Sequence, residues 1–151
     1  MERLKEALSA AGIAYKENEP LCAHCTFRIG GPADLFVLPE NEEQLCAAIR
    51  LAKEAGVRSY LLGNGSNILF EDAGYRGAVI NVSAMKSSIG IIENISFPGK
   101  DPALTYDAVV VGAGQMLSSL CMAALENSLT GLEFAYGIPG TVGGAVYMNA
   151  G

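Results

Sequence analysis

The spacing of apolar residues predicts a helix over residues 1–11, which ends where Gly12 lets the chain turn. The apolar stripe of this helix consists of Leu4, Leu8 and Ala11. The same spacing predicts a second helix that begins after Asn41 and ends at Gly56. Asn41 is its expected N-cap, and Gln44, three residues on, has a capping-box-like position. Its apolar face consists of Leu45, Ala48, Ile49, Ala52 and Ala55. Each helix is therefore expected to cover a core with one face.

Shorter apolar runs, bounded by turn-forming residues, predict strands. The expected strands cover residues 34–38, 59–62, 78–82, 89–97 and 108–111, and residues 98–106 are expected to form a turn. A third helix is expected over residues 116–127. Its buried face consists of Leu117, Leu120, Cys121, Ala124 and Leu125. Strands and helices mixed at this density indicate an α+β fold.

Composition narrows the classes of protein to which the chain can belong. Half of its 151 residues are hydrophobic, which is enough for a real core. The net charge of −6 argues against binding to nucleic acid or to an anionic membrane, because both reward a basic face. No apolar run is long enough to span a bilayer, and the first residues lack the apolar stretch of a secretory signal. The cytoplasm is therefore the expected location.

The glycine-rich loop Gly63-Asn-Gly-Ser-Asn67 directly follows the strand predicted at 59–62. Two glycines let such a loop curl so that successive N–H groups point inward, and such a nest holds an anion, most often a phosphate. Ser66 and Asn67 add side-chain donors. The loop is neither a P-loop nor a Rossmann fingerprint, since no Gly-Lys-Ser/Thr follows and Ile68 stands at the third glycine position. A plain tight turn is the alternative.

Two further glycine-rich segments lie in the C-terminal half of the chain. Gly112-Ala-Gly114 precedes a predicted helix, whose first N–H groups can face an anion or a polar ring edge; an ordinary loop is the alternative. The segment from Gly137 to Ala145 combines four glycines with Pro139 and the hydroxyl of Thr141. This combination suits a flat ring with a polar chain, as in a nucleotide or a flavin. The alternative is a glycine-permitted crossing of two backbones.

Arg28 is a candidate contact for a phosphate or a carboxylate, and it stands just before the turn Gly30-Gly31-Pro32. The alternative is a structural ion pair between Arg28 and Asp34 or another acid. The residues alone leave both roles open.

The four cysteines are irregularly spaced, which fits reduced thiols better than a disulfide framework. Cys22-Ala-His-Cys25 has no second ligand pair at zinc spacing, so no metal site is expected. His24, the only histidine, is too isolated for a catalytic dyad. Cys46 and Cys121 fall on predicted apolar helix faces, where cysteine acts as a small hydrophobe.

Three blocks of sequence together resemble one known family. They read Thr26-Phe-Arg-Ile-Gly-Gly-Pro-Ala-Asp34, Leu62-Gly-Asn-Gly-Ser-Asn-Ile-Leu69, and Gly131-Leu-Glu through Asn149-Ala-Gly151. In this order they are similar to the UDP-N-acetylenolpyruvoylglucosamine reductases, also called UDP-N-acetylmuramate dehydrogenases, which are flavoenzymes of bacterial peptidoglycan precursor synthesis. The resemblance covers nearly the whole chain, and the motif Gly-Ile-Pro-Gly-Thr-Val-Gly-Gly-Ala is its most specific part.

The resemblance implies a two-lobed FAD-binding module of the vanillyl-alcohol-oxidase (PCMH) type, with noncovalent FAD between the lobes. Residues 1–82 then form the first lobe and residues 83–151 an incomplete second lobe. The loop that it assigns to FAD, with the pyrophosphate at its centre, consists of Leu62, Gly63, Asn64, Gly65, Ser66, Asn67 and Ile68. The residues that it assigns to the flavin and its ribityl chain are Gly112, Ala113, Ile138, Pro139, Gly140, Thr141, Val142, Gly143, Gly144 and Ala145.

The resemblance also implies a reaction. In the family, NADPH reduces FAD, the flavin passes hydride to UDP-N-acetylglucosamine-enolpyruvate, and a protein acid protonates the adjacent carbon. This reaction serves cell-wall biogenesis, and through it cell shape and cell division.

The chain resembles only the front half of the family. The family's catalytic arginine, and the C-terminal substrate-binding domain with its serine acid and its glutamate, have no counterpart, so no catalytic residue is expected here. An incomplete lobe is expected to leave a strand edge and apolar surface exposed, which favours self-association or a partner that supplies the missing strands. The alternatives are another flavin oxidoreductase of the same superfamily and a non-catalytic nucleotide- or flavin-binding fragment.

Overall fold

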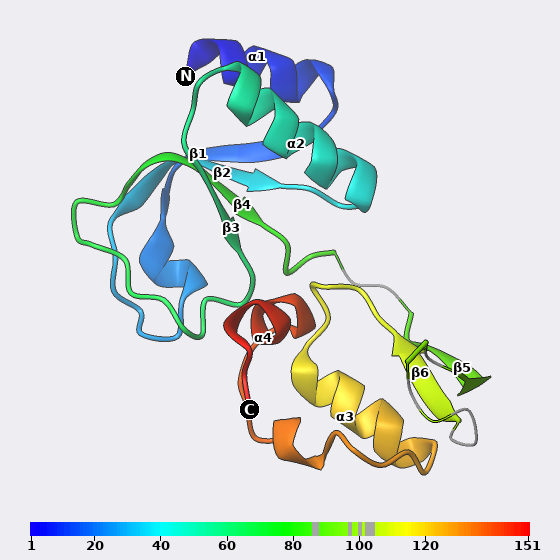
Figure 1. Cartoon of the computed structure of the whole chain (residues 1–151). Helices are drawn as coiled ribbons and strands as arrows, with labels where there is room; N and C mark the ends of the chain where they lie inside the picture. The colour runs from blue at the N-terminus through cyan, green and yellow to red at the C-terminus, as the bar shows by residue number, and fades with distance from the viewer. Residues whose placement is uncertain (86–87, 97, 100, 102–104) are drawn as a thin grey trace. The chain divides into compact units, whose positions relative to one another are not determined.

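The computed structural model describes residues 1–85, 88–96, 98–99, 101 and 105–151, and Figure 1 follows them from blue to red. The chain divides into two compact units, Met1–Met85 (unit 1) and Lys86–Gly151 (unit 2), each with helices and strands. The α+β class predicted from the sequence is therefore confirmed. The division lies close to the lobe boundary expected at residues 82–83, and the assignment of the two units to FAD-binding lobes stays a prediction.

Unit 1 is built on a four-stranded sheet in the order β1-β2-β4-β3. The strands are β1 (Ala14–Pro20), β2 (Pro32–Leu38), β3 (Ser59–Leu62) and β4 (Tyr75–Asn81). β1 runs antiparallel to β2, whereas β2 and β3 each run parallel to β4. Since Leu62 pairs with Asn81, β3 and β4 end at the same edge of the sheet, where the glycine-rich loop begins.

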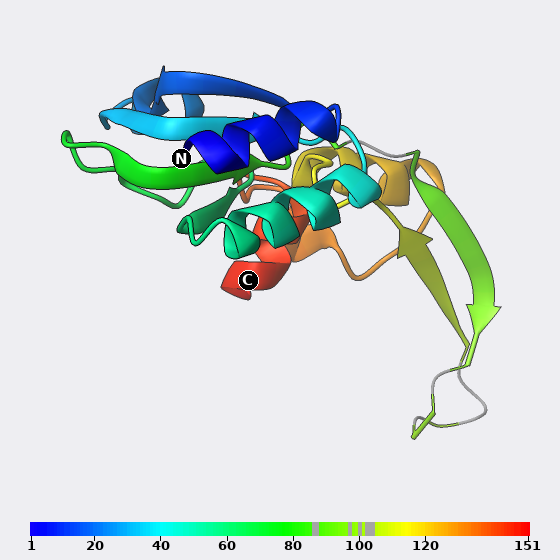
Figure 2. The same cartoon turned by 90° about the horizontal axis from the view of Figure 1, so that it is seen from above.

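Two helices, α1 (Glu2–Ala10) and α2 (Glu42–Glu54), cover one face of this sheet (Figures 1 and 2). Asn41 caps α2 as predicted, because its side chain accepts a hydrogen bond from the Gln44 N–H at 2.9 Å. Oε1 of Gln44 accepts from the Glu40 N–H at 2.8 Å, one residue earlier than in a capping box. The core below the helices consists of Leu4, Leu8, Ile13, Leu35, Val37, Ala48, Ala52, Ala78 and Ile80.

Three residues predicted on the apolar faces of these helices are exposed instead. Ala11 lies just beyond the end of α1, and Ile13 takes the expected place in the core with 2% exposure. Ile49 is 38% exposed and Cys46 is also exposed, since α2 packs through a narrow stripe that contains its two buried alanines. The prediction that Cys46 lies on a buried face is therefore wrong.

The opposite face of the sheet packs against the 3-10 helix η1 (Leu21–His24) and the loops around it. This second core consists of Leu21, Cys25, Ala33, Phe36, Leu62, Phe70 and Val79. The sequence pattern does not predict β1, because this strand reads Ala-Tyr-Lys-Glu-Asn-Glu-Pro and lies at an edge of the sheet. Charged side chains are common on edge strands, where they hinder pairing with other chains.

Unit 2 combines a two-stranded antiparallel sheet with short helices. Its elements are β5 (Gly90–Ile95), β6 (Tyr106–Val110), α3 (Leu117–Glu126), η2 (Glu133–Ala135) and α4 (Val142–Met148). The predicted face of α3 is buried at Leu117, Leu120, Cys121 and Ala124. Leu125 is 68% exposed, however, because it lies outside the stripe of α3 that forms the core of this unit.

In unit 2 one predicted strand differs in extent from the structure, and one helix is not predicted by the sequence pattern. The strand expected over residues 89–97 is β5, which ends at Ile95, and Phe97 lies outside the described residues. The sequence pattern does not predict α4, because Gly143 and Gly144 are poor helix formers. Within the described part of the chain, no helix has the length and apolarity needed to cross a membrane.

Candidate functional site

The glycine-rich loop after β3 is fixed in place by close backbone packing. Gly65 is buried and has a left-handed φ of +64°. A Cβ at this position would lie 2.1 Å from the carbonyl oxygen of His24 and 2.8 Å from Cα of Cys25. Both the dihedral angle and the packing therefore require glycine here.

Thr26 fastens this loop to the segment after η1. The Thr26 N–H donates to the carbonyl oxygen of Gly65 at 3.1 Å, and its hydroxyl lies 3.4 Å from the same oxygen and 3.5 Å from the carbonyl oxygen of Ser66. These contacts join the first two sequence blocks, because Gly65 and Ser66 lie 39 and 40 residues after Thr26 in the chain. The resemblance to a family rests on both blocks, and the structure brings them together.

Asn81 supports the start of the same loop from the end of β4. Its side chain is 5% exposed, and its amide nitrogen Nδ2 donates to the carbonyl oxygen of Gly63 at 3.0 Å. Its Oδ1 accepts from the N–H and the hydroxyl of Ser83. No motif in the sequence singles out Asn81; the available signal is an asparagine at the end of the apolar run Ala78-Val-Ile80.

The turn that contains Gly30 and Gly31 packs against the segment after the loop. A Cβ on Gly30 would lie 2.5 Å from Cβ of Phe70, and a Cβ on Gly31 would lie 2.1 Å from the carbonyl oxygen of Asp72. The Gly31 N–H also donates to the carbonyl oxygen of Glu71 at 2.9 Å. These two glycines therefore have a structural role.

Asp34 is not the partner of Arg28. The Asp34 carboxylate pairs with Arg76 at 2.9 Å, and Nη2 of Arg76 also donates to the carbonyl oxygen of Pro32 at 2.9 Å. Among the described residues, no ion pair or side-chain hydrogen bond involves Arg28. The structural alternative for Arg28, an ion pair with Asp34, is therefore not formed.

Arg28 instead lines a hollow of about 560 Å³ in unit 1, which we call the Arg28 pocket. The residues that line it are Cys22, Ala23, His24, Cys25, Thr26, Arg28 and Asn64. The segment after β1 supplies all of them except Asn64, which belongs to the glycine-rich loop. The pocket is therefore next to the loop predicted to hold the pyrophosphate.

His24 is held at the side of this pocket by two contacts. Its Nε2 lies 2.8 Å from Oε1 of Glu19, and its ring stacks on Phe36 with 4.0 Å between the ring centroids. Hydrogen bonds from Lys16 first and from His24 second lower the pKa of Glu19. All four cysteines are free, and no group of three or more possible metal ligands occurs among the residues that the structure describes.

In unit 2 the structure brings together the two segments predicted to hold the flavin. The Gly143 N–H donates to the carbonyl oxygen of Ala113 at 2.9 Å, and the Val142 N–H donates to that of Gln115 at 2.8 Å. A Cβ on Gly143 would lie 2.8 Å from Cβ of Ala113. The two backbones thus cross closely at Gly143, which is the glycine-permitted crossing given above as the alternative to a ligand site.

Some of the polar groups in these segments are already used within the fold. The Thr141 side chain is 1% exposed, and its Oγ1 accepts from the Gly144 N–H at 3.2 Å as the N-cap of α4. The Leu117 N–H at the start of α3 donates to the carbonyl oxygen of Gly140 at 3.0 Å. The expectation of free N–H groups at the start of α3 is therefore wrong at Leu117.

One buried polar atom beside these segments has no partner. Oε1 of Gln115 is buried and accepts no hydrogen bond from any described residue. Such an acceptor needs a donor from water or from a ligand. The hydroxyls of a ribityl chain and the imide N–H of a flavin are donors of this kind, so the chemistry of Gln115 fits the cofactor expected here.

Comparisons with known proteins identify the family of the chain. The family described as "FAD binding domain" matches residues 33–151. A UDP-N-acetylenolpyruvoylglucosamine reductase of Clostridium perfringens is 40% identical over 156 aligned residues, which cover 100% of this chain and 47% of the relative. The chain thus spans about half the length of the curated relatives it matches.

Solved structures give the same result. The reductase from Thermus caldophilus is similar with a TM-score of 0.59 and 30% identity, covering 92% of this chain and 42% of that one. A vanillyl-alcohol-oxidase-type flavoprotein from Myceliophthora thermophila shares the fold with a TM-score of 0.54 at 16% identity, covering 68% of this chain and 18% of that one. The predicted fold class is confirmed by these neighbours.

Proposed function

Because this chain belongs to the FAD binding domain family, we propose that it is the FAD-binding part of a reductase that converts UDP-N-acetylglucosamine-enolpyruvate to UDP-N-acetylmuramate. The observation that carries the proposal is the glycine-rich loop after β3, in which Gly65 is locked beneath the His24 carbonyl and Thr26 holds the loop closed. The loop is fixed before any ligand arrives, which lowers the entropic cost of binding.

In unit 1, the residues assigned to the diphosphate of FAD are Leu62, Gly63, Asn64, Gly65, Ser66, Asn67 and Ile68. Asn64 and Asn67 are exposed, so their carboxamides can donate to phosphoryl oxygens. Gly65 and Leu62 are buried and support the loop from below. Asn81 then acts as a positioning residue, because it holds the carbonyl of Gly63.

In unit 2, the residues assigned to the flavin ring and its ribityl chain are Gly112, Ala113 and residues 138–145. Ala113, Pro139 and Gly144 are exposed there and offer small or rigid surfaces to a flat ring. Thr141 contributes through the cap that orders α4. We add Gln115, whose buried Oε1 has no donor among the described residues, to the residues that would hold the cofactor.

The complete reaction extends beyond these residues. Bound FAD would supply hydride transfer from NADPH to the enolpyruvyl double bond. We assign the acid that protonates the adjacent carbon to the part of the enzyme outside the aligned half, since the relatives are about twice as long as the aligned region. By this assignment the enzyme serves peptidoglycan synthesis in the cytoplasm, and thereby cell shape and cell division.

A visible absorption spectrum tests the proposal. The purified chain is mixed with FAD, desalted and scanned, and we expect a retained flavin band with a shifted maximum. A folded chain that retains no flavin would contradict FAD binding by these residues. Ser118→Ala is a matched control, because Ser118 is exposed on α3 outside the assigned residues and should leave the band unchanged.

A second measurement separates this proposal from a non-catalytic binding fragment. The chain is incubated with FAD, NADPH and UDP-N-acetylglucosamine-enolpyruvate, and NADPH oxidation is followed. We expect slow flavin reduction without sustained turnover, because the chain has no assigned acid. Sustained oxidation that depends on the enolpyruvyl substrate would show that the acid lies within residues 1–151.

A further inference from the structure

The Arg28 pocket has the charge of an anion site in an acidic protein. The chain has 16 acidic and 10 basic residues, yet no residue that lines the pocket is an aspartate or a glutamate. Of its polar side chains, the Thr26 hydroxyl and the Cys25 thiol donate to backbone carbonyls, and the His24 imidazole is paired with Glu19. The guanidinium of Arg28 and the carboxamide of Asn64 are the strong donors that remain for a ligand. A negatively charged ligand is therefore favoured over a cation.

Arg28 is also free to take up a ligand, whereas three of the other four arginines of unit 1 are engaged and the fourth, Arg3, is on α1 and does not line the pocket. Arg50 pairs with Glu54, Arg76 pairs with Asp34, and Arg58 lies 5.5 Å from the centre of the Tyr75 ring. Among the described residues, no ion pair or side-chain hydrogen bond involves Arg28. An unpaired guanidinium suits phosphoryl oxygens, because its planar fork can donate two parallel hydrogen bonds.

The backbone holds Arg28 at the pocket in an unusual conformation. Arg28 has a left-handed φ of 55°, which a residue with a side chain rarely adopts. Its N–H donates to the carbonyl oxygen of Cys25 at 3.2 Å, and Sγ of Cys25 donates to that of Ile29 at 3.3 Å. Strained residues that the surroundings fix in this way gather at ligand sites, where the side chain has to be positioned in advance.

We propose that the Arg28 pocket binds the diphosphate of the flavin dinucleotide, with the Arg28 guanidinium and the Asn64 carboxamide as side-chain donors. This inference rests on the proposed function and adds a charged residue that lies before the glycine-rich loop in the sequence. Arg28 and the loop meet because Thr26, two residues from Arg28, is hydrogen-bonded to Gly65. The same segment thus closes the loop and supplies its positive charge.

Calorimetric titration of the full chain tests the inference with FAD, ADP, NADPH and riboflavin. We expect Arg28→Gln to weaken binding of FAD and of ADP about tenfold or more, the scale of a charge-assisted hydrogen bond. Riboflavin has no phosphate, so its affinity should stay within about twofold of that of the wild type. Arg28→Lys keeps the charge but loses the planar guanidinium, so we expect its loss of FAD and ADP affinity to be smaller than that of Arg28→Gln.

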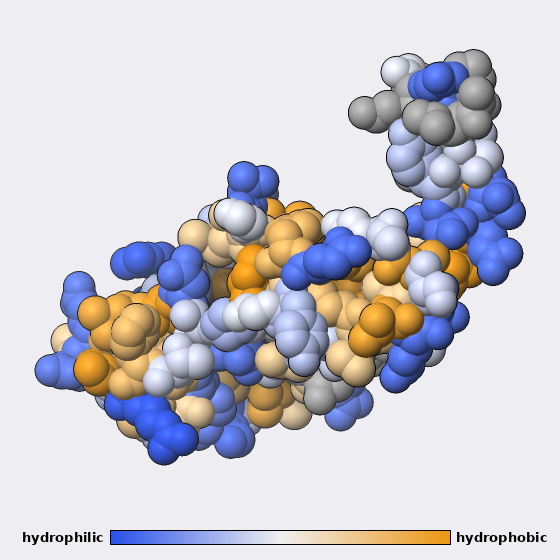
Figure 3. All heavy atoms as spheres, turned by 90° about the horizontal axis from the view of Figure 1, so that it is seen from below, coloured by the Kyte–Doolittle hydropathy of each residue, from blue (hydrophilic) through white to orange (hydrophobic). Residues whose placement is uncertain are grey.

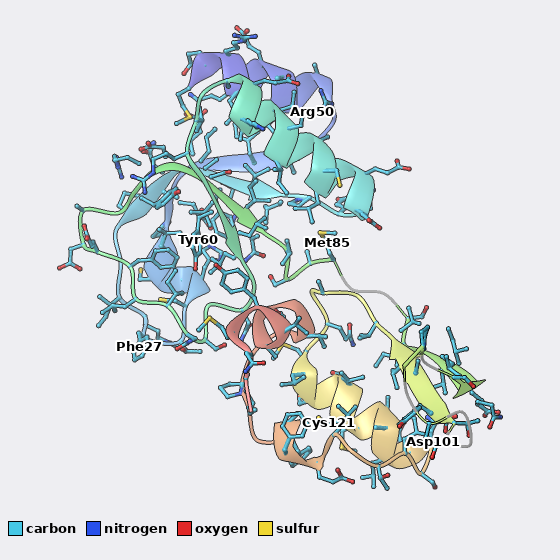
Figure 4. All side chains as sticks on the ribbon, viewed as in Figure 1. Phe27, Arg50, Tyr60, Met85, Asp101 and Cys121 are labelled. Carbon is cyan, nitrogen blue, oxygen red and sulfur yellow. The ribbon has the colours of Figure 1, made fainter. Side chains whose placement is uncertain are left out.

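Arg50→Gln is the matched control, because it removes the same charge from α2, on the other face of the sheet. Figure 4 labels Arg50 on α2 and Phe27, which precedes Arg28 in the sequence, at the opposite side of unit 1. The FAD affinity of the Arg50→Gln variant should equal that of the wild type. Circular dichroism of each variant shows whether it is folded, which is expected since Arg28 and Arg50 are both exposed.

The outcomes distinguish this inference from the proposed function. If Arg28→Gln binds FAD as tightly as the wild type, the inference is overturned and the proposed function stands. If ADP binds in an Arg28-dependent manner and FAD does not bind, the pocket binds diphosphates, but its assignment to FAD and the proposed function both fail. NADPH carries a diphosphate too, so a loss confined to NADPH overturns the assignment to FAD. If the wild type binds none of these nucleotides, both fail.

Discussion

Gly65 shows how one residue connects the fold to the candidate site. We expect Gly65→Ala to lower the free energy of unfolding by about 3 kcal/mol, because the added methyl group meets the His24 carbonyl and the backbone is left-handed. Urea unfolding followed by circular dichroism measures this loss. The flavin band should also weaken, since the loop must shift to accept the methyl group.

Gly12→Ala is the control for that substitution. Gly12 has nearly the same φ, +66°, but a Cβ there meets no atom within 4 Å. Gly12→Ala should therefore lower the free energy of unfolding by only about 1 kcal/mol, which is the cost of a side chain in a left-handed conformation. Equal losses at Gly12 and Gly65 would mean that the packing around Gly65 contributes nothing.

Glu19 makes the stability of unit 1 depend on pH. Lys16 and then His24 lower the pKa of Glu19 from its ordinary 4.5, so the ionised form stabilises the fold. This contribution is present above pH 4.5 and is lost as the pH falls through the lowered pKa of the folded state. We expect Glu19→Gln to lower the free energy of unfolding by about 0.5 kcal/mol at pH 7, the scale of a partly exposed ion pair.

Urea unfolding at pH 7 and at pH 3 checks this prediction. The difference in the free energy of unfolding between the wild type and Glu19→Gln should be smaller at pH 3 than at pH 7. It should also shrink in a Lys16→Met background, because Lys16 is the main cause of the lowered pKa. A difference that is the same at both pH values would exclude Glu19 as the source of the dependence.

At the scale of the elements, α4 depends on its N-cap more than a typical helix does. It has seven residues, two of them glycine, and the Thr141 hydroxyl accepts from the Gly144 N–H at 3.2 Å. We expect Thr141→Val to lower the free energy of unfolding by about 1 kcal/mol, because it removes the hydroxyl that accepts from the Gly144 N–H but keeps the shape of the side chain. Hydrogen exchange should rise at the Gly144 amide. Unchanged protection there would rule out this cap as the support of α4.

Periodicity predicts most of the elements, and the failures have physical causes. β2, β3, β4, α2 and α3 follow from apolar runs and caps such as Asn41. β1 escapes prediction because its stability comes from pairing with β2 rather than from apolar side chains of its own. The glycine-rich loop is visible in the sequence, but the locking of Gly65 and the role of Asn81 need contacts between distant segments.

At the scale of the whole molecule, the exposed apolar surface favours association. Five large apolar side chains of unit 2 are 50–87% exposed, namely Phe134, Tyr136, Val146, Tyr147 and Met148. In Figure 3 residues of high hydropathy are orange, and orange atoms reach the surface over much of the face shown. A monomer rarely exposes so much apolar surface in one segment. We therefore expect the chain to form dimers or larger species at micromolar concentration.

Sedimentation velocity measures this association. Replacing Val146 and Tyr147 by serine should raise the monomer fraction several-fold. The same change at Phe27 and Ile29, which are 58% and 50% exposed in unit 1, should have little effect. A single monomeric species of the wild type would contradict the prediction.

The hydrogen bonds from Thr26 to Gly65 also bear on where a functional fragment can begin. The family match starts at residue 33, within β2, so a fragment cut there would still contain the glycines of the loop after β3 and of segments 112–114 and 137–145. It would nevertheless lose Thr26, Arg28 and the whole of β1, and β2 would become an open edge. The smallest unit that contains the proposed cofactor site is therefore larger than residues 33–151, the region that the family matches.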